Sequence, residues 1–233
     1  MAGRGRRADG VRPLNLNSTV LTAAGTPALR FAGAPAHPAA VPRFARSRLQ
    51  RVPGESLKGQ LLIAAPLLSD PNFRRTVVLV LEHNAEGALG LVLNRPSETA
   101  ASEMLPELAP VVGAEPVYVG GPVQPEAVIA LAELPDTATG DGAVFGPVAS
   151  IDAGTDPDEL RTLAQRVRVF VGYAGWGEGQ LDAELEEEAW FTDAARPGDV
   201  FEADPESLWR SVLERKGGSF RLVSRMPDDP RMN

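Results

Sequence analysis

Three apolar runs separated by short polar connections constrain the fold of this 233-residue chain more than any other feature. The runs are Gln60–Pro66, Thr76–Glu82 and Ala88–Leu93, and each has the length and the Val, Leu and Ile content of a buried strand. The connections, Ser69–Asn72 and Glu86–Gly87, consist of residues that favour turns. Because parallel strands need a long crossover connection, the sequence predicts an antiparallel three-stranded sheet here.

The rest of the chain predicts helices interleaved with further strands. The first helix is expected to run from Ser97, as its N-cap, through Leu108. Two more open at Asp-Pro pairs, over residues 156–166 and 204–215, and another covers 180–187. Short apolar segments predict further strands over residues 116–119, 127–134, 144–150, 167–173 and 190–192. Hairpins first and helices later indicate an α+β fold.

Charge divides the chain into two parts. The first 52 residues contain nine arginines and one acidic residue, a charge of +8, whereas the remaining 14 basic and 30 acidic residues give −16. The N-terminal part also has five prolines between residues 13 and 42 and no apolar periodicity. We therefore expect a disordered basic tail over residues 1–56 and a single domain over 57–233. The tail could be a plain extension or an early start codon, an organellar transit peptide, or an arm for nucleic acid or another anionic surface.

Composition excludes several classes of function. An acidic body disfavours direct DNA binding, since it repels the phosphate backbone. No run approaches the 18 apolar residues of a membrane-spanning helix. The absence of cysteine excludes disulfides and cysteine-ligated zinc and fits a cytoplasmic protein.

Catalytic motifs are also missing from the sequence. The body contains one histidine, His83, which is too few for a histidine zinc site, and no Gly-x-Ser-x-Gly elbow. Its two lysines, Lys58 and Lys216, do not follow Walker A spacing. We predict no catalytic residue, metal or cofactor and favour a protein that is not an enzyme. His83 is interpreted as a structural strand-end residue, with a cleft residue as the alternative.

Two further patterns allow a structural and a functional interpretation. The Gly175–Gly179 segment lacks a dinucleotide fingerprint, so it is either a turn covered by Trp176 or an anion site before a helix. The arginines at 74, 75 and 95 flank buried strands and form either internal clamps or an anion-binding cleft with Gly120 and Gly121. The glutamates at 184 and 186–188 are interpreted as a solvated helix face.

Several blocks of the sequence form a recognisable set: residues 61–64, 70–78, 82–84, 90–96, 120–123, 172–176 and 179–181, with Glu184 and Trp190. Together these blocks resemble the YqgE/AlgH family of bacterial proteins. They occur in the family's order and cover about residues 57–225, whereas the tail through Val52 has no counterpart.

The resemblance implies a fold more than a function. It implies an α+β domain with a strongly bent, mixed but mainly antiparallel sheet approaching a pseudo-barrel, with helices packed outside. It also implies a cytosolic protein whose family carries a transcriptional-regulator label, from the control of alginate synthesis in one branch. The family provides no established catalytic residues.

The strand-end loops of the matched blocks form our candidate site, because each loop follows a strand and we expect them to gather at one rim of the sheet. The candidate ligand-binding residues are Arg75, His83, Asn94, Arg95, Gly120, Gly121, Tyr173, Gly175, Trp176 and Gln180. Our leading hypothesis is a non-enzymatic regulatory or binding protein that acts through protein or small-ligand contacts. The alternative is a small-anion-binding protein or enzyme with a cleft around Arg95 and Trp176. The identity of the ligand or partner and the oligomeric state are left open.

Overall fold

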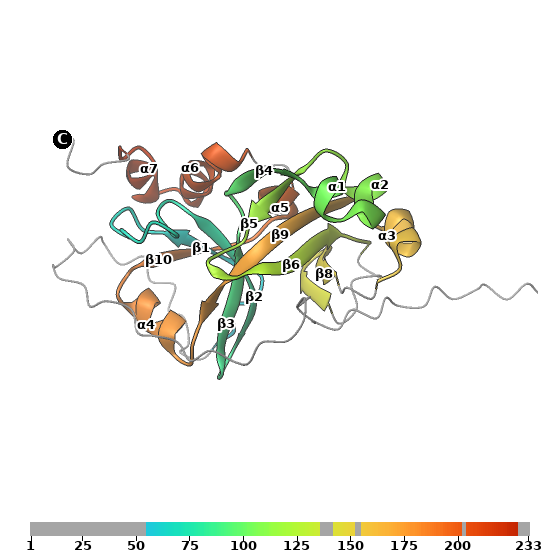
Figure 1. Cartoon of the computed structure of the whole chain (residues 1–233). Coiled ribbons are helices and arrows are strands. Elements are labelled where there is room, and N and C mark those ends of the chain that lie inside the picture. The colour runs from blue at the N-terminus through green and yellow to red at the C-terminus, as the bar shows by residue number, and fades with distance from the viewer. Residues whose placement is uncertain (1–54, 136–141, 152–154, 202–203, 228–233) are drawn as a thin grey trace, which may run out of the picture.

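The computed structural model describes residues 55–135, 142–151, 155–201 and 204–227 (Figure 1). The predicted basic tail lies almost wholly outside these ranges, so the division at residues 56 and 57 stays a prediction. The strands are β1 Gln60–Ala64, β2 Val77–Asn84, β3 Gly87–Val92, β4 Pro96–Ala100, β5 Pro116–Val119, β6 Val123–Glu133, β7 Ala143–Phe145, β8 Val148–Ile151, β9 Arg166–Trp176 and β10 Trp190–Ala194. The helices are α1 Ala101–Met104, α2 Ala109–Val112, α3 Pro157–Leu163, α4 Gln180–Glu186, α5 Pro197–Phe201, α6 Pro205–Lys216 and α7 Phe220–Val223, with a 3₁₀ turn, η1, at Pro106–Leu108.

The fold is α+β, as predicted, with one strongly curled sheet that forms a half-barrel (Figure 1). The strand order is β10-β1-β2-β3-β9-β6-β8-β7, and β4 and β5 branch from this path. The predicted antiparallel sheet of the first three strands is confirmed, since β2 pairs antiparallel with both β1 and β3. Only the pairing of β5 with β9 is parallel among the described strands.

The sheet forks along one edge of β9. Near its C-terminal end β9 pairs with β3, where Gly90 faces Ala174, and further back it pairs with β5, where Tyr118 faces Phe170. Gly120 lies between the two pairings: its N–H donates to the Val171 carbonyl at 2.8 Å, and its own carbonyl accepts from Val92 at 2.8 Å. The backbones approach so closely that a Cβ on Gly120 would lie 2.4 Å from a carbonyl oxygen of β9. Glycine is therefore required where the sheet divides.

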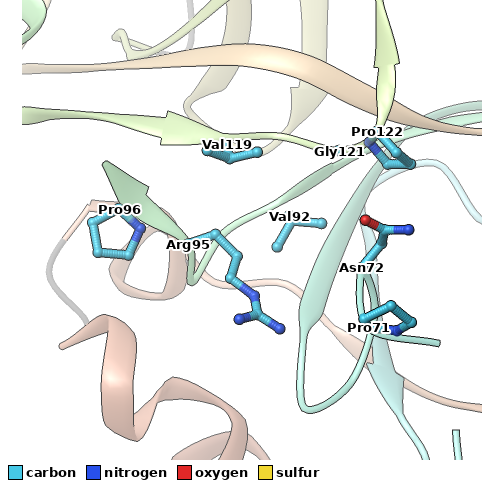
Figure 2. Close-up of a pocket in the computed structure, with 8 residues that line it drawn as sticks. All are labelled: Pro71, Asn72, Val92, Arg95, Pro96, Val119, Gly121 and Pro122. Carbon is cyan, nitrogen blue, oxygen red and sulfur yellow. The ribbon is translucent and has the colours of Figure 1, made fainter. Parts of the chain in front are cut away.

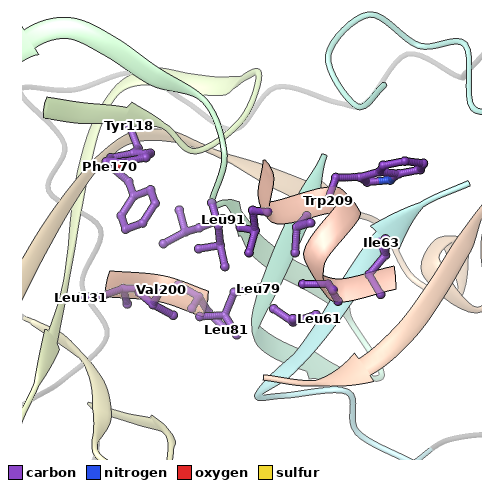
Figure 3. Close-up of a cluster of buried hydrophobic side chains, with 14 of the residues drawn as sticks. Leu61, Ile63, Leu79, Leu81, Leu91, Tyr118, Leu131, Phe170, Val200 and Trp209 are labelled. Carbon is purple, nitrogen blue, oxygen red and sulfur yellow. The ribbon is translucent and has the colours of Figure 1, made fainter. Parts of the chain in front are cut away.

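Helix α6 covers the core of the curled sheet. The core cluster in Figure 3 joins Leu61 of β1 and Leu91 of β3 to Val212 and Trp209 of α6. The Trp209 indole N–H donates to the Ala64 carbonyl at 2.9 Å, which satisfies a buried donor and fixes the helix on the sheet. Strand β1 is thus fixed by a helix about 145 positions later in the chain.

The prediction of a helix from Ser97 to Leu108 is wrong for its first third, residues 97–100. Residues 96–100 form β4, which pairs with β5, and the following helical turns begin only at Ala101. The Ser97 hydroxyl accepts a hydrogen bond from the Thr99 backbone within this strand and does not cap a helix. Pairing with β5 satisfies the backbone of this segment, so the tertiary contact prevails over the local capping signal.

Several other element boundaries also differ from the prediction, among them the start of β6, which lies at Val123 and not at residue 127. The single strand expected over residues 144–150 is a hairpin, β7 and β8, because Gly146 adopts φ +44° and reverses the chain. Strand β9 continues to Trp176, so Gly175 and Trp176 belong to a strand and the turn is confined to residues 177–179. Helix α3 ends at Leu163 and not at residue 166, where β9 begins.

The capping signals at the two Asp-Pro pairs are confirmed. The Asp156 side chain accepts from the Asp158 N–H at 2.9 Å, and Asp204 caps α6 in the same way. Helix α6 ends at Lys216, one residue beyond the predicted end, with Gly217 as its C-cap, and α7 follows it. Helix α5, before α6, was not predicted.

Candidate functional site

An open groove lies at the fork of the sheet, and we call it the fork groove (Figure 2). Its volume is about 310 Å³. It gathers three loops that the sequence places after strands: the connection after β1, the Asn-Arg-Pro segment after β3 and the Gly-Gly-Pro segment after β5. Its lining residues are Pro71, Asn72, Val92, Arg95, Pro96, Val119, Gly121 and Pro122.

Asn94 joins the β3 end of the groove to the start of β2. Its side-chain carbonyl accepts from the Val77 N–H at 3.0 Å, and its amide donates to the Arg75 carbonyl at 2.9 Å. The Asn94 side chain therefore makes two hydrogen bonds to the backbone next to β2, in place of the backbone hydrogen bonds that end with β3. Asn94 thus connects the end of β3 to the segment that precedes β2, and it is not among the lining residues of the groove.

Arg95 contributes the positive charge of the groove. Its guanidinium Nη2 donates to the Arg74 carbonyl at 2.9 Å, and the residue is exposed. Figure 2 shows the side chain extending past Val92 toward the Pro71–Asn72 side of the groove. The hydrogen bond fixes one edge of the guanidinium and leaves the group at the surface.

The loop that carries Pro71 and Asn72 is held by its own backbone and by an aromatic contact. The Asp70 side chain accepts from the Asn72 N–H at 2.8 Å, and the Asp70 carbonyl accepts from both Phe73 and Arg74. The Phe73 ring stacks on Trp176 at a centroid distance of 6.3 Å. These contacts give the loop a defined conformation.

Arg75 is engaged inside the fold. Its guanidinium lies 4.6 Å from the centroid of the Trp209 ring and donates to the Met226 carbonyl. Its backbone adopts φ +54°, which an arginine rarely adopts. The side chain thus ties the C-terminal region to α6 and is not a lining residue of the groove.

Trp176 and Gln180 belong to a hydrogen-bonded group around one carboxylate, the Glu184 cluster. The Trp176 and Trp190 indoles donate to Glu184 Oε2 at 2.9 and 2.8 Å, and the Gln180 amide donates to Oε1 at 3.0 Å. Both indoles are buried. The interpretation of Glu184 as part of a solvated face is therefore wrong, whereas residues 186–188 are exposed as predicted. Trp176 contacts the groove's loop through Phe73, and it is not among the lining residues of the groove.

His83 lies at the other end of β2 from the fork groove. Its Nδ1 accepts from the Leu57 N–H at 3.1 Å, and its Nε2 lies 3.6 Å from an Asp182 carboxylate oxygen. Six residue-to-residue steps along β2 separate His83 from Val77, a distance of about 20 Å. The structure thus places His83 where it anchors the entry of the chain into the domain, far from Arg95.

The remaining predicted residues lie along β9 and the Gly-Gly-Pro segment. Tyr173 is half-buried, and its burial raises the pKa of its hydroxyl, as does nearby Glu126 to a smaller extent. A Cβ on Gly121 would lie 2.2 Å from the Tyr173 carbonyl carbon, so this glycine permits close contact with β9. Gly175 is part of β9 and has the Tyr173 ring as a neighbour. Of the ten predicted residues, the fork groove is lined by Arg95 and Gly121.

Sequence reasoning missed most of the apolar lining of the groove. Val119 is 43% exposed although it ends a strand of apolar residues, and Pro71 and Pro122 lie in connecting segments whose prolines the sequence does not identify as lining residues. In β5 the neighbouring residues Val117 and Tyr118 are both buried and Val119 is exposed, so the strand shows no alternation from which the sequence could have identified the exposed position.

Within the described ranges, no group of three or more His, Cys, Asp or Glu side chains is placed to hold a metal ion. The helices of the same ranges include none that is both long and apolar enough to cross a membrane.

Comparison with known proteins identifies relatives along most of the domain. A family model described as AlgH-like matches residues 61–221. A UPF0301 protein of Streptomyces coelicolor is 44% identical over 186 residues, which cover 76% of this chain and 96% of that protein. One from Rhodococcus opacus is 42% identical over 182 residues, covering 75% and 90%.

Two solved structures share the fold. The crystal structure of protein DIP2367 from Corynebacterium diphtheriae superimposes with a TM-score of 0.69 at 28% identity and covers 76% of this chain and 95% of that one. The solution structure of the AlgH protein from Pseudomonas aeruginosa gives a TM-score of 0.56 at 34% identity and covers 77% and 98%.

Proposed function

The chain belongs to the AlgH-like family of UPF0301 proteins, and we propose that it is a non-enzymatic regulatory or binding protein whose contact site is the fork groove. In this proposal a single domain over residues 57–233 follows a basic tail and acts in the cytoplasm through contacts with a protein or a small ligand. The proposal goes beyond family membership and rests on the geometry of the groove.

One observation carries the proposal: an exposed apolar side chain, Val119, lies in a concave surface built from loops that are held in place. Asn94 and Arg95 fasten the β3 end of the groove to the carbonyls of Arg75 and Arg74. A binding surface that is already ordered loses little conformational entropy when a ligand arrives. Exposed apolar surface in such a concavity is typical of an interaction site.

Two side chains that could act as a general acid or base, His83 and Glu184, already have partners within the protein, and this supports a binding role over catalysis. Both ring nitrogens of His83 face groups of the protein, and the Glu184 carboxylate accepts from two indoles and an amide. A general acid or base needs a proton that the substrate can reach, and these side chains are already committed to internal partners. The acidic body also supports a partner other than DNA.

A small-anion-binding protein or enzyme is the second candidate, and Arg95 is the observation that favours it. Its exposed guanidinium could hold a carboxylate or a phosphate in two parallel hydrogen bonds. Trp176 no longer supports this alternative directly, because its indole N–H is directed to Glu184.

A thermal-shift screen of the full chain against metabolites, nucleotides and short peptides tests the proposal. A ligand that binds only the folded state raises the melting temperature. We expect compounds that stabilise the natural protein to lose their effect in Val119→Asp and to keep it in Leu222→Asp, a matched control because Leu222 is 70% exposed on α7. Ligands that stabilise Val119→Asp as much as the natural protein would show that the binding site is not the fork groove. Chemical conversion of a bound ligand would show that the protein is an enzyme.

A further inference from the structure

We infer that the partner of the fork groove is an extended peptide segment of another protein, with one carboxylate side chain among apolar or proline residues. This inference rests on the proposed function and names the class of ligand for the same groove. It follows from the chemistry of the lining, from the charge of Arg95 and from the open shape.

The lining offers mainly apolar contact. Five of its eight residues are Val or Pro, and three prolines stand on different loops (Figure 2). Proline has no N–H to donate, and its ring keeps the backbone rigid. A partner segment would therefore bind largely by burying apolar surface against Val119 and the proline rings.

Arg95 is the only charged residue among those that line the groove. It stands on a body of charge −16, so a partner with many negative charges would be repelled over most of the surface. A single carboxylate placed on the guanidinium gains the attraction without that penalty. The charge pattern thus selects a partner with one acidic side chain at this position.

The donors in the groove fit a carboxylate better than a phosphate. Phosphate sites in proteins present several backbone N–H groups, at a helix N-terminus or in a glycine-rich nest. Here the lining contains three residues without an N–H, and no lysine. The planar guanidinium of Arg95 matches a carboxylate in the two-bond arrangement.

The shape favours a peptide over a small organic acid. Pockets for small molecules usually enclose most of the ligand, and their volumes start near the roughly 300 Å³ found here. The fork groove is open to solvent, and Val119 is 43% exposed. An extended segment can lie across such a surface and continue beyond it, so it gains contact that a small acid could not make.

The test is an array of random heptapeptides probed with the labelled full chain and with its variants Arg95→Gln and Val119→Ser. We expect the peptides that bind the natural protein to be enriched in one Asp or Glu next to Val, Leu or Pro. For these peptides, Arg95→Gln should weaken binding about 10- to 100-fold, as the loss of a charge-assisted pair predicts. Arg161→Gln is the matched control, since Arg161 is an exposed arginine on α3, and it should bind as the natural protein does.

The variants also separate the groove from the basic tail. Acidic peptides that bind through the N-terminal arginines keep their affinity in both groove variants, and an array that selects only such peptides counts against the inference. Melting temperatures within a few degrees of the natural protein show that the variants are folded, and Val119→Ser, at an exposed position, provides a second test if Arg95→Gln is unstable.

Three results would overturn the inference. The first is a set of bound peptides without an acidic residue, or with affinities unchanged in both groove variants. The second is stabilisation by acetate, succinate or phosphate at millimolar concentration with no peptide selected, which would leave the binding function in place but assign it to a small anion. The third is a dimer of the chain in sedimentation that Val119→Ser dissociates, which would assign the groove to a second copy. If neither the peptide array nor the thermal-shift screen finds a ligand, the proposed function itself fails.

Discussion

Removing the carboxylate of the Glu184 cluster should destabilise the whole domain. In Glu184→Ala the buried indole N–H groups of Trp176 and Trp190 lose their acceptor. Each unsatisfied donor costs about 1–3 kcal/mol, and the partly exposed site lets water replace some of the loss, so we expect the free energy of unfolding to fall by about 2–4 kcal/mol. Glu184→Gln keeps an acceptor for the indoles but not the charge, and it should cost about 1–2 kcal/mol.

Equilibrium unfolding in urea, followed by far-ultraviolet circular dichroism at pH 7, measures these free energies. The matched control is Glu186→Ala on the same helix, because Glu186 is exposed and its substitution should change stability by less than about 0.5 kcal/mol. A Glu184→Ala variant within about 1 kcal/mol of the natural protein would refute the reasoning, since it would mean that the two indoles find other acceptors.

Three further predictions concern the rest of the fold. Asp199→Ala removes the carboxylate that the Arg215 guanidinium contacts at 2.6 and 3.0 Å, while Asp193 stays 3.3 Å from the same group. Calorimetry should therefore show a loss of about 1.5–3 kcal/mol, and a loss below about 0.5 kcal/mol would contradict a structural ion pair. Gly120→Ala places a Cβ 2.4 Å from a backbone oxygen and should abolish folding or lower the melting temperature sharply. Gly177→Ala is the control and should fold normally, because the nearest atom to its Cβ is a flexible side-chain oxygen at 3.9 Å. Equal melting temperatures of the two variants would refute the close approach of the backbones at the fork. Burial raises the pKa of the Tyr118 hydroxyl, so its contribution to stability is complete below its unfolded pKa of about 10 and is lost as the pH rises through the folded pKa. The free energy of unfolding should therefore fall less steeply above about pH 10 in Tyr118→Phe than in the natural protein. An unchanged slope would count against this reasoning.

The sequence predicted the elements whose signals are local. The first three strands follow from continuous apolar runs with short connections, and their antiparallel pairing follows from the length of those connections. The starts of α3 and α6 follow from Asp-Pro, because the aspartate accepts from the second N–H beyond it in any context. The family resemblance added the curled sheet, which no local pattern could have given.

The errors occur where a distant partner determines the local state. Residues 96–100 carry a helix signal at Ser97 and yet form β4, because β5 provides the backbone partners. Glu184 belongs to an acidic run that predicts a solvent-exposed helix face. In the structure, however, its carboxylate accepts hydrogen bonds from two tryptophans, one in β9 and one in β10. A periodicity of charges on one helix contains no information about those strands.

The sequence by itself determined that this chain has strands followed by Asn-Arg-Pro and Gly-Gly-Pro, and an acidic body with one histidine and no cysteine, because composition and short-range patterns fix these properties. Only the tertiary structure decided which strand ends meet. The forked pairing of β9 brings the loops after β1, β3 and β5 together around Arg95 and Val119. The length of β2 keeps His83 about 20 Å from the end of that strand at the groove. The hydrogen bond to Glu184 directs the Trp176 indole N–H into the fold. Those outcomes depend on contacts between residues far apart in the chain, and such contacts form only when the whole sheet is assembled.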